Sequence, residues 1–292
     1  MKVYIGCPIW SFKGWVGNFY PEGTKSTQYL YEYARRLTTI EGNTTFYAVP
    51  AAKTVESWAE QTPESFRFCA KIPKAISHEG QLADHIERAR EFVNVLRPLG
   101  PRLGPMLLQL PPRYSPRLQA DLAQFLGEFP KDVRLAVEVR HLDWFDSPHR
   151  EGLNELLSSH NVARVVIDTR PIRDLAGDKI LEGSTYENLL AARERKPDVP
   201  VFLDRTTDFI FLRFIGHPDL AHNGQWIDEW VDYLVPELQA GASAFLICHA
   251  PASLTEPYIC REFYSRLSAR IDLPPLPWDE IEPNVPEQPS LF

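Results

Sequence analysis

The sequence predicts an α/β protein, a single-domain TIM-type (β/α)8 barrel. Eight short apolar runs recur along the chain, and helical patterns lie between them. The runs are apolar almost throughout, which is typical of strands covered on both faces in a parallel sheet. No glycine-rich dinucleotide fingerprint follows any run, so we expect neither an open doubly wound sheet nor a nucleotide cofactor. The barrel is expected at residues 1–272 and an extended, proline-rich tail at residues 273–292.

The predicted strands cover residues 2–7, 38–43, 66–72, 106–110, 134–139, 163–168, 209–215 and 242–248. After the third strand, apolar residues spaced by three and four from Leu82 to Leu96 predict an amphipathic helix. Ser115-Pro116 predicts a helix start after the fourth strand, with serine as N-cap and proline in the first turn. Residues 175–200, after the sixth strand, mix loop and helix signals and leave the helix there unplaced.

The composition is that of a globular protein with a sizeable core. Hydrophobic residues make up 44% of the chain, and no run reaches the length of a membrane span. The amino terminus lacks a cleavage signal, so we expect a cytoplasmic protein without membrane contact. The four cysteines lack a metal-binding spacing and are predicted to be buried free thiols. A net charge of −8 argues against a surface that binds nucleic acid non-specifically.

Polar residues are concentrated where the predicted strands end, which is the face that carries the site in such barrels. The candidates for catalysis are Glu41, Lys71, Glu138 and Asp168. The chemistry of Glu41 suits a general base, and that of Lys71 suits a phosphate ligand or a nucleophile. The alternative is structural: Lys71 pairs with Glu41 or Glu138, and the polar groups tie neighbouring strands together.

A second set of residues predicts that the ligand is an anion. The candidates for binding it are Asn43, Tyr47, Gln109, Arg140, Arg213 and His249. Glu138 and Arg140 lie two apart on a strand and therefore point to the same side, either as an ion pair or toward one ligand. Cationic residues in the loops at this face favour phosphate or carboxylate, and solvated loop arginines are the alternative.

A divalent metal is a further hypothesis. Its candidate ligands are Glu138, Asp168, His217 and His249, because carboxylates and imidazoles bind hydrolytic metals. No HxH or HExxH spacing supports such a site, and histidines that cap helices or form hydrogen bonds are the alternative.

Several motifs resemble one known family. The stretches IGCPIWSFKGWVGNFYPEG, IEGNTTFYAVP, TVESWAEQTPESFRFCAKIP, LGPMLLQLPPRY and LAVEVRHLDWF occur in this order and are similar to the YecE-like TIM-barrel family, domain of unknown function 72. The resemblance covers about residues 2–270 and implies a barrel, but no agreed reaction. That barrel is similar to endonuclease IV, which suggests a nucleic-acid role by analogy of fold. The stretches RFIGHP and CHAP depart from the common family pattern and predict a subgroup with His217 and His249 at the mouth.

The last residues predict a protein partner. Gln288, Ser290, Leu291 and Phe292 resemble the pentapeptide by which bacterial replication and repair proteins bind the DNA sliding clamp, although Pro289 stands where leucine is usual. A glutamine amide fixes the register, adjacent leucine and phenylalanine fill an apolar pocket, and a proline-stiffened tail loses little entropy on docking.

Three functions remain open from the sequence. The first is a DNA-maintenance factor, a metal-assisted phosphoester hydrolase with an anion-binding mouth, with nucleic acid as the anion. The second is a metal-free enzyme acting on a small anionic metabolite such as a sugar phosphate. The third is a binding or scaffold protein without catalysis.

Overall fold

The structure is a computed structural model that describes residues 2–281, without the side chains of residues 179 and 180. All eight predicted strands are confirmed in this range, and every ladder between them is parallel. The strands are β1 (Lys2–Gly6), β2 (Thr39–Gly42), β3 (Arg67–Ala70), β4 (Met106–Gln109), β5 (Leu135–Glu138), β6 (Ala163–Asp168), β7 (Phe209–Ile215) and β8 (Ser243–His249). The prediction of an α/β fold with parallel strands is therefore correct.

The strands form two sheets that lie edge to edge. Six strands make one sheet in the order β1-β8-β7-β6-β5-β4, and β2 pairs with β3 in the other. At one seam the amide of Glu41 donates to the carbonyl of Cys7 (3.1 Å), and at the other the amide of Ile72 donates to Leu107 (2.9 Å). Gly6 allows β1 to approach β2, because a Cβ at this position would lie 1.8 Å from the carbonyl oxygen of Thr39. Backbone hydrogen bonds thus cross both seams.

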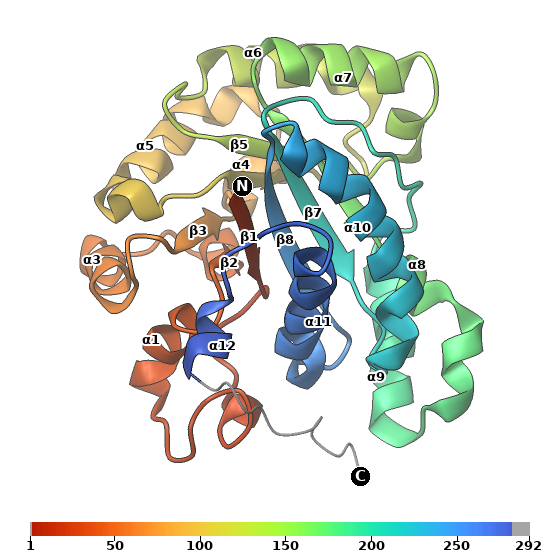
Figure 1. Ribbon diagram of the computed structural model, residues 1–292. Coiled ribbons are helices and arrows are strands. Elements are labelled where there is room, and N and C mark those ends of the chain that lie inside the picture. Colours follow the sequence, from red (N-terminus) through yellow and green to blue (C-terminus); the bar gives the residue numbers. More distant parts are fainter. Residues whose placement is uncertain (1, 282–292) are drawn as a thin grey trace.

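Helices surround the strands (Figure 1). They are α1 (Tyr29–Ala34), α2 (Thr44–Tyr47), α3 (Ala52–Gln61), α4 (Lys74–Ser77), α5 (Ile86–Leu96), α6 (Gln119–Glu128), α7 (His149–Ser159), α8 (Arg170–Arg173), α9 (Gly183–Arg195), α10 (Gly224–Gln239), α11 (Glu256–Ser268) and α12 (Pro277–Ile281). The predicted apolar stripe of α5 is buried along its length. Ser115-Pro116 opens a 3-10 turn that leads into α6 rather than the α-helix itself, and the Ser115 side chain makes no capping hydrogen bond. The unplaced segment after β6 contains a 3-10 turn and α9.

Successive side chains of each strand point to opposite faces, and this alternation divides the core into two parts. One face packs on the helices, and the other encloses a smaller apolar cluster among the strands. The cluster comprises Cys69, Leu107, Ala136, Ala163, Val165, Phe209, Phe211, Phe245 and Ile247. A residue two positions beyond a member of this cluster points to the same side of its strand. The cluster therefore forms an apolar floor beneath the side chains at the carboxyl ends of the strands.

The chain end described by the structure corrects the prediction of an extended tail from residue 273. Residues 277–281 form α12, which lies beside α1 (Figure 1). Trp278 is 1% exposed, its ring centroid lies 4.9 Å from that of Phe19, and its amide donates to the carbonyl of Arg36 (3.3 Å). The proposed clamp-binding residues Gln288, Leu291 and Phe292 lie outside the described residues.

Two other predictions concern the whole chain. Within residues 2–281 no helix combines the length and the apolar character needed to cross a membrane. The four cysteines are free and buried, as predicted.

Candidate functional site

A buried polar network lies on the apolar floor at the carboxyl ends of the strands. Arg213 of β7 is at its centre. Its Nε and Nη2 donate to the two carboxylate oxygens of Glu41 on β2 (2.7 and 2.9 Å), and its Nη1 donates to Glu138 Oε2 on β5 (2.5 Å). Glu41 and Glu138 are fully buried. One arginine therefore joins a carboxylate of the small sheet to a carboxylate of the large one.

The network continues from Glu138 toward β3. Arg140 Nε donates to Glu138 Oε1 (2.5 Å), which confirms that the two side chains point to the same side. Arg140 Nη2 donates to Gln109 Oε1 on β4 (2.8 Å), and Lys71 Nζ donates to the same oxygen (2.8 Å). Lys71 also lies over the ring of Phe46, with Nζ 4.2 Å from the centroid. Lys71 therefore bonds to Gln109 and not to Glu41 or Glu138, the partners expected by the structural alternative.

The other end of the network passes through His249 of β8. Its Nε2 lies 3.5 Å from Glu41 Oε2, and its Nδ1 lies 3.5 Å from Lys196 Nζ. Lys196 follows α9 in the long segment between β6 and β7, and Arg173 fixes its backbone by donating to its carbonyl (2.8 Å). The sequence does not reveal this lysine, because it enters from a loop and follows no strand.

The charges in the network are held in fixed states. Burial acts to raise the pKa of Glu41, but Arg213 and His249 hold that pKa well below its usual value. Burial likewise opposes ionisation of Glu138, but Arg140, Arg213 and Lys71 lower its pKa to about 2. Burial and the Lys196 cation lower the pKa of His249 to about 3. At neutral pH both carboxylates are thus ionised and His249 is neutral.

The two lysines differ from the other groups of the network. Burial, followed by the nearby Arg213 cation, lowers the pKa of Lys71 from 10.5 to about 8. The same two causes, in the same order, lower the pKa of Lys196 to about 8. Only these two network groups have a pKa shifted to a value near neutrality, and such groups can both donate and accept protons.

Asp168 does not reach this network. It is buried at the end of β6, but Ala163 and Val165 belong to the inner cluster, so Asp168 alternates to the helix side. Its Oδ2 accepts from Trp230 Nε1 (2.8 Å) and from Arg170 Nη2 (2.8 Å). These contacts tie Asp168 to Trp230 and Arg170 and place it apart from the other three candidates for catalysis.

Three other predicted residues also lie apart from the network. Asn43 Nδ2 donates to the carbonyl of Pro8 (3.1 Å), and Tyr47 is 82% exposed on α2. His217 is buried after β7, where its Nδ1 accepts from the amide of Asp219 (3.1 Å). Within residues 2–281 no group of three or more His, Cys, Asp or Glu side chains is arranged to hold a metal. The four metal candidates are therefore not brought together.

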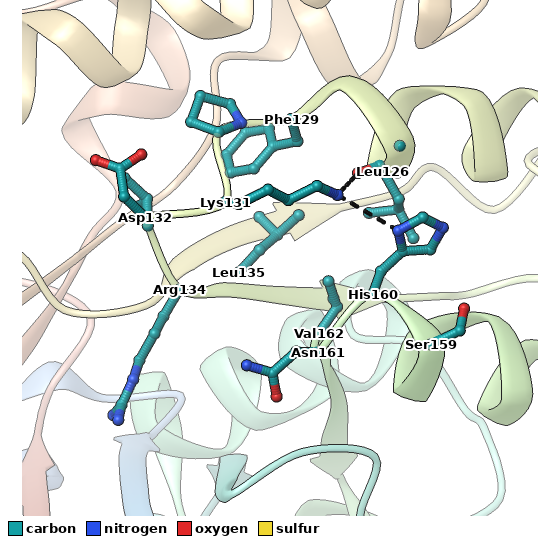
Figure 2. A pocket seen from close by; sticks show the side chains of 13 residues that line it. Leu126, Phe129, Lys131, Asp132, Arg134, Leu135, Ser159, His160, Asn161 and Val162 are labelled. Atoms are coloured by element: carbon teal, nitrogen blue, oxygen red, sulfur yellow. Dashed lines mark hydrogen bonds between the residues drawn. The ribbon is translucent and has the colours of Figure 1, made fainter.

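A cavity at the other end of the strands contains none of the predicted residues. It has a volume of about 600 Å³ and opens between the loops that lead into β5 and β6 (Figure 2). Two cationic side chains line it, Lys131 and Arg134. Lys131 Nζ donates to the carbonyl of Leu126 (2.6 Å) and lies 3.4 Å from His160 Nδ1. The polar network and this cavity are separate features at opposite ends of the strands.

Known proteins are similar to this chain in sequence and in fold. The family model for "Protein of unknown function DUF72" matches residues 4–281. The UPF0759 protein YecE of Escherichia coli K12 is 35% identical over 291 residues, which is 99% of this chain and 100% of that protein. The UPF0759 protein YunF of Bacillus subtilis is 25% identical over 201 residues, which is 66% of this chain and 67% of that protein.

Two crystal structures of DUF72 family proteins are similar in fold. The one from Enterococcus faecalis V583 has a TM-score of 0.68 and 18% identity, covering 94% of this chain and 96% of that one. The one from Thermotoga maritima MSB8 has a TM-score of 0.67 and 20% identity, covering 92% of this chain and 100% of that one. Because the family model matches residues 4–281 of the 292, the chain belongs to the family of proteins of unknown function DUF72.

Proposed function

We propose that this protein is a metal-free enzyme that binds the phosphate or carboxylate group of a small metabolite in the mouth of a closed barrel. The supporting observation is that the polar network ends in two lysines, Lys71 and Lys196, neither of which has a carboxylate oxygen of residues 2–281 within the 4.0 Å of an ion pair. Glu41 and Glu138 are already neutralised by Arg213 and Arg140. The mouth therefore carries an excess of positive charge that an anionic ligand would balance.

Barrel closure is part of this proposal. The hydrogen bonds that cross from β1 to β2 and from β3 to β4 support a ring of eight strands. In such a ring, Glu41, Arg213 and Glu138 face one another across the interior, which agrees with their mutual contacts.

Lys71 is the acid–base group in this proposal. The ionised carboxylates and the neutral His249 change protonation far from neutral pH, whereas the pKa of Lys71 is about 8. A group with a pKa near the working pH transfers protons most effectively. The role of Glu41 and Glu138 is to hold Arg213, rather than to act as general bases.

The geometry favours this function over the two alternatives. A metal-assisted hydrolase needs several carboxylates or imidazoles that converge, and Asp168 and His217 are engaged elsewhere. A scaffold without ligand would gain nothing from a buried ammonium group, since burying a charge without an opposite charge is costly.

Metabolite conversion tests the proposal. Wild-type protein, freed of metal by a chelator, is incubated with a mixture of small phosphates and carboxylates, and mass spectrometry follows their conversion. We expect conversion by the wild type and loss of it in Lys71→Met. Lys2→Met removes the same charge from an exposed position at the amino end of β1 and serves as the matched control. Conversion that needs added metal, or that survives in Lys71→Met, would refute the proposal.

A second proposal concerns the partner. We propose that residues 288–292 bind the DNA sliding clamp and bring the barrel to replicating or repaired DNA. The spacing of Gln288, Leu291 and Phe292 supports it, as does their position beyond α12, the end of the family match. A DNA-maintenance role rests on this peptide alone.

A further inference from the structure

We propose that the mouth binds a ligand with two separate anionic groups, one held at Lys71 and the other at Lys196. The inference rests on the function proposed above and specifies its ligand class: a small metabolite with a phosphate or carboxylate at each end.

The charge pattern along the network is the first argument. Between the two lysines, the side chains follow one another in the order Gln109, Arg140, Glu138, Arg213, Glu41 and His249. Two arginines and two carboxylates in this series cancel, so the uncompensated positive charges lie only at its two ends. An anion placed midway would face two arginines and two carboxylates whose charges cancel, whereas an anion at either end would face an ammonium group.

The Lys71 end is built as an anion site. The amide of Lys71 donates to Gly42 (3.4 Å), and its carbonyl accepts from Thr45 Oγ1 (2.6 Å), so the backbone is fixed. Burial and then the Lys71, Arg113, Arg140 and Lys74 cations lower the pKa of His78 to about 4. The lowered pKa of His78 indicates that cations on several sides create a positive potential at this end of the mouth.

The Lys196 end is built independently of the strands. Arg173 donates to the carbonyls of Arg193 (3.1 Å) and Lys196 (2.8 Å), and the amide of Lys196 donates to Ala192 (2.9 Å). His249 is neutral, and its Nδ1 faces the ammonium at 3.5 Å as an acceptor. The lysine is thus fixed in place by groups that do not neutralise it.

The strands that carry the two ends are not neighbours. Lys71 follows β3 and His249 ends β8, and the seams place β2 and β1 between them. Lys196 itself reaches His249 from the segment between β6 and β7 and not from a strand. The two lysines therefore enter the mouth from different parts of the chain and lie against different partners, Gln109 and His249, which suits two separate groups of one ligand.

Binding of matched probes tests the inference. The probes are inorganic phosphate and the mono- and bisphosphates of straight-chain diols with two to six carbons, titrated by calorimetry at pH 7. We expect at least one bisphosphate to bind tenfold or more tightly than its own monophosphate. In Lys196→Met the ratio of these two affinities should fall toward one, and Lys196→Arg should restore it. Lys2→Met, with thermal unfolding as a check on folding, controls for the loss of one charge.

The possible outcomes separate the two proposals. If monophosphates bind through Lys71 but no bisphosphate of the series binds more tightly, the two-ended ligand is refuted and the anion site stands. The same conclusion follows if Lys196→Met leaves the affinity ratio unchanged. The same titrations with straight-chain mono- and dicarboxylates cover the other anion class. If neither phosphates nor carboxylates bind to the wild type, the proposed function fails together with this inference.

Discussion

Replacing Arg213 by methionine should destabilise the protein strongly, because two buried carboxylates depend on this one guanidinium. Its three hydrogen bonds to Glu41 and Glu138 measure 2.5 to 2.9 Å. The pKa of Glu138 lies at about 2 instead of 4.5. Because one pKa unit is worth about 1.4 kcal/mol, this difference corresponds to about 3 kcal/mol, the net of the stabilising cations and the opposing cost of burial. Removing one partner of a buried ion pair costs about 3–5 kcal/mol.

We therefore expect Arg213→Met to lower the free energy of unfolding by about 3–5 kcal/mol at pH 7, measured by urea denaturation and tryptophan fluorescence. The matched control is Arg270→Met, which breaks the exposed pair with Asp232 and should cost no more than about 1 kcal/mol. Replacing Glu41 and Glu138 by glutamine in the Arg213→Met background removes the unpaired charges and should recover most of the loss.

The pH dependence gives this prediction a distinct signature. In the wild type the pKa values of both carboxyls lie below those of the unfolded chain, so their contribution is complete above about pH 4.5 and is lost in stronger acid. Without Arg213, burial raises the pKa of Glu41 above its unfolded value, and stability should rise as the pH falls from 7 toward 4.5. A defect equal at pH 5 and pH 7, or no larger than that of Arg270→Met, would show that the reasoning is wrong.

Four further predictions follow from other features. Asp168→Asn should lower the free energy of unfolding by about 1–3 kcal/mol without changing phosphate affinity in calorimetry. A loss of phosphate affinity with unchanged stability would instead show that Asp168 belongs to the ligand site. Phosphate affinity should fall about tenfold per pH unit above pH 8 as Lys71 loses its charge, whereas the Lys71→Arg variant should bind phosphate with constant affinity up to pH 10. The same pH dependence in both proteins would show that Lys71 is not the titrating group. Gly6→Ala should lower the melting temperature, while Gly127→Ala on α6, where the new Cβ meets open space, should leave it equal or higher; equal losses would contradict the close approach of β1 and β2. Immobilised sliding clamp should retain the full chain but not a chain lacking residues 288–292, and equal recovery of both would remove the clamp proposal.

The apolar character of the strands made them predictable from the sequence, but it also limited how well the site could be predicted. Strands buried on both faces are apolar throughout, so they are easy to recognise. The same uniformity hides which face points inward. From Ala163 to Ile167 every residue except Arg164 is apolar, and nothing in the pattern shows that Asp168 faces the helices while Glu138 faces the interior.

Two other differences arise outside the strands. Lys196 comes from a segment whose sequence assigns neither helix nor loop clearly, so its contact with His249 depends on tertiary structure alone. The prolines after residue 273 suggested an extended chain, but Pro277 occupies the first turn of α12, where proline is favourable, and Trp278 buries its ring.

The segment between β6 and β7 makes the site divisible into two parts. Glu41, Lys71, Gln109, Glu138 and Arg213 belong to the strands or their ends. Lys196 belongs to residues 169–208, whose buried Ile172 and Leu189 pack in one cluster with Ile167 of β6 and Ile215 of β7. If the mouth binds an anion as proposed, the strands set one part of the ligand site and this segment sets the other. A substitution at Lys196 would then change which ligand is bound without moving the strand-borne charges.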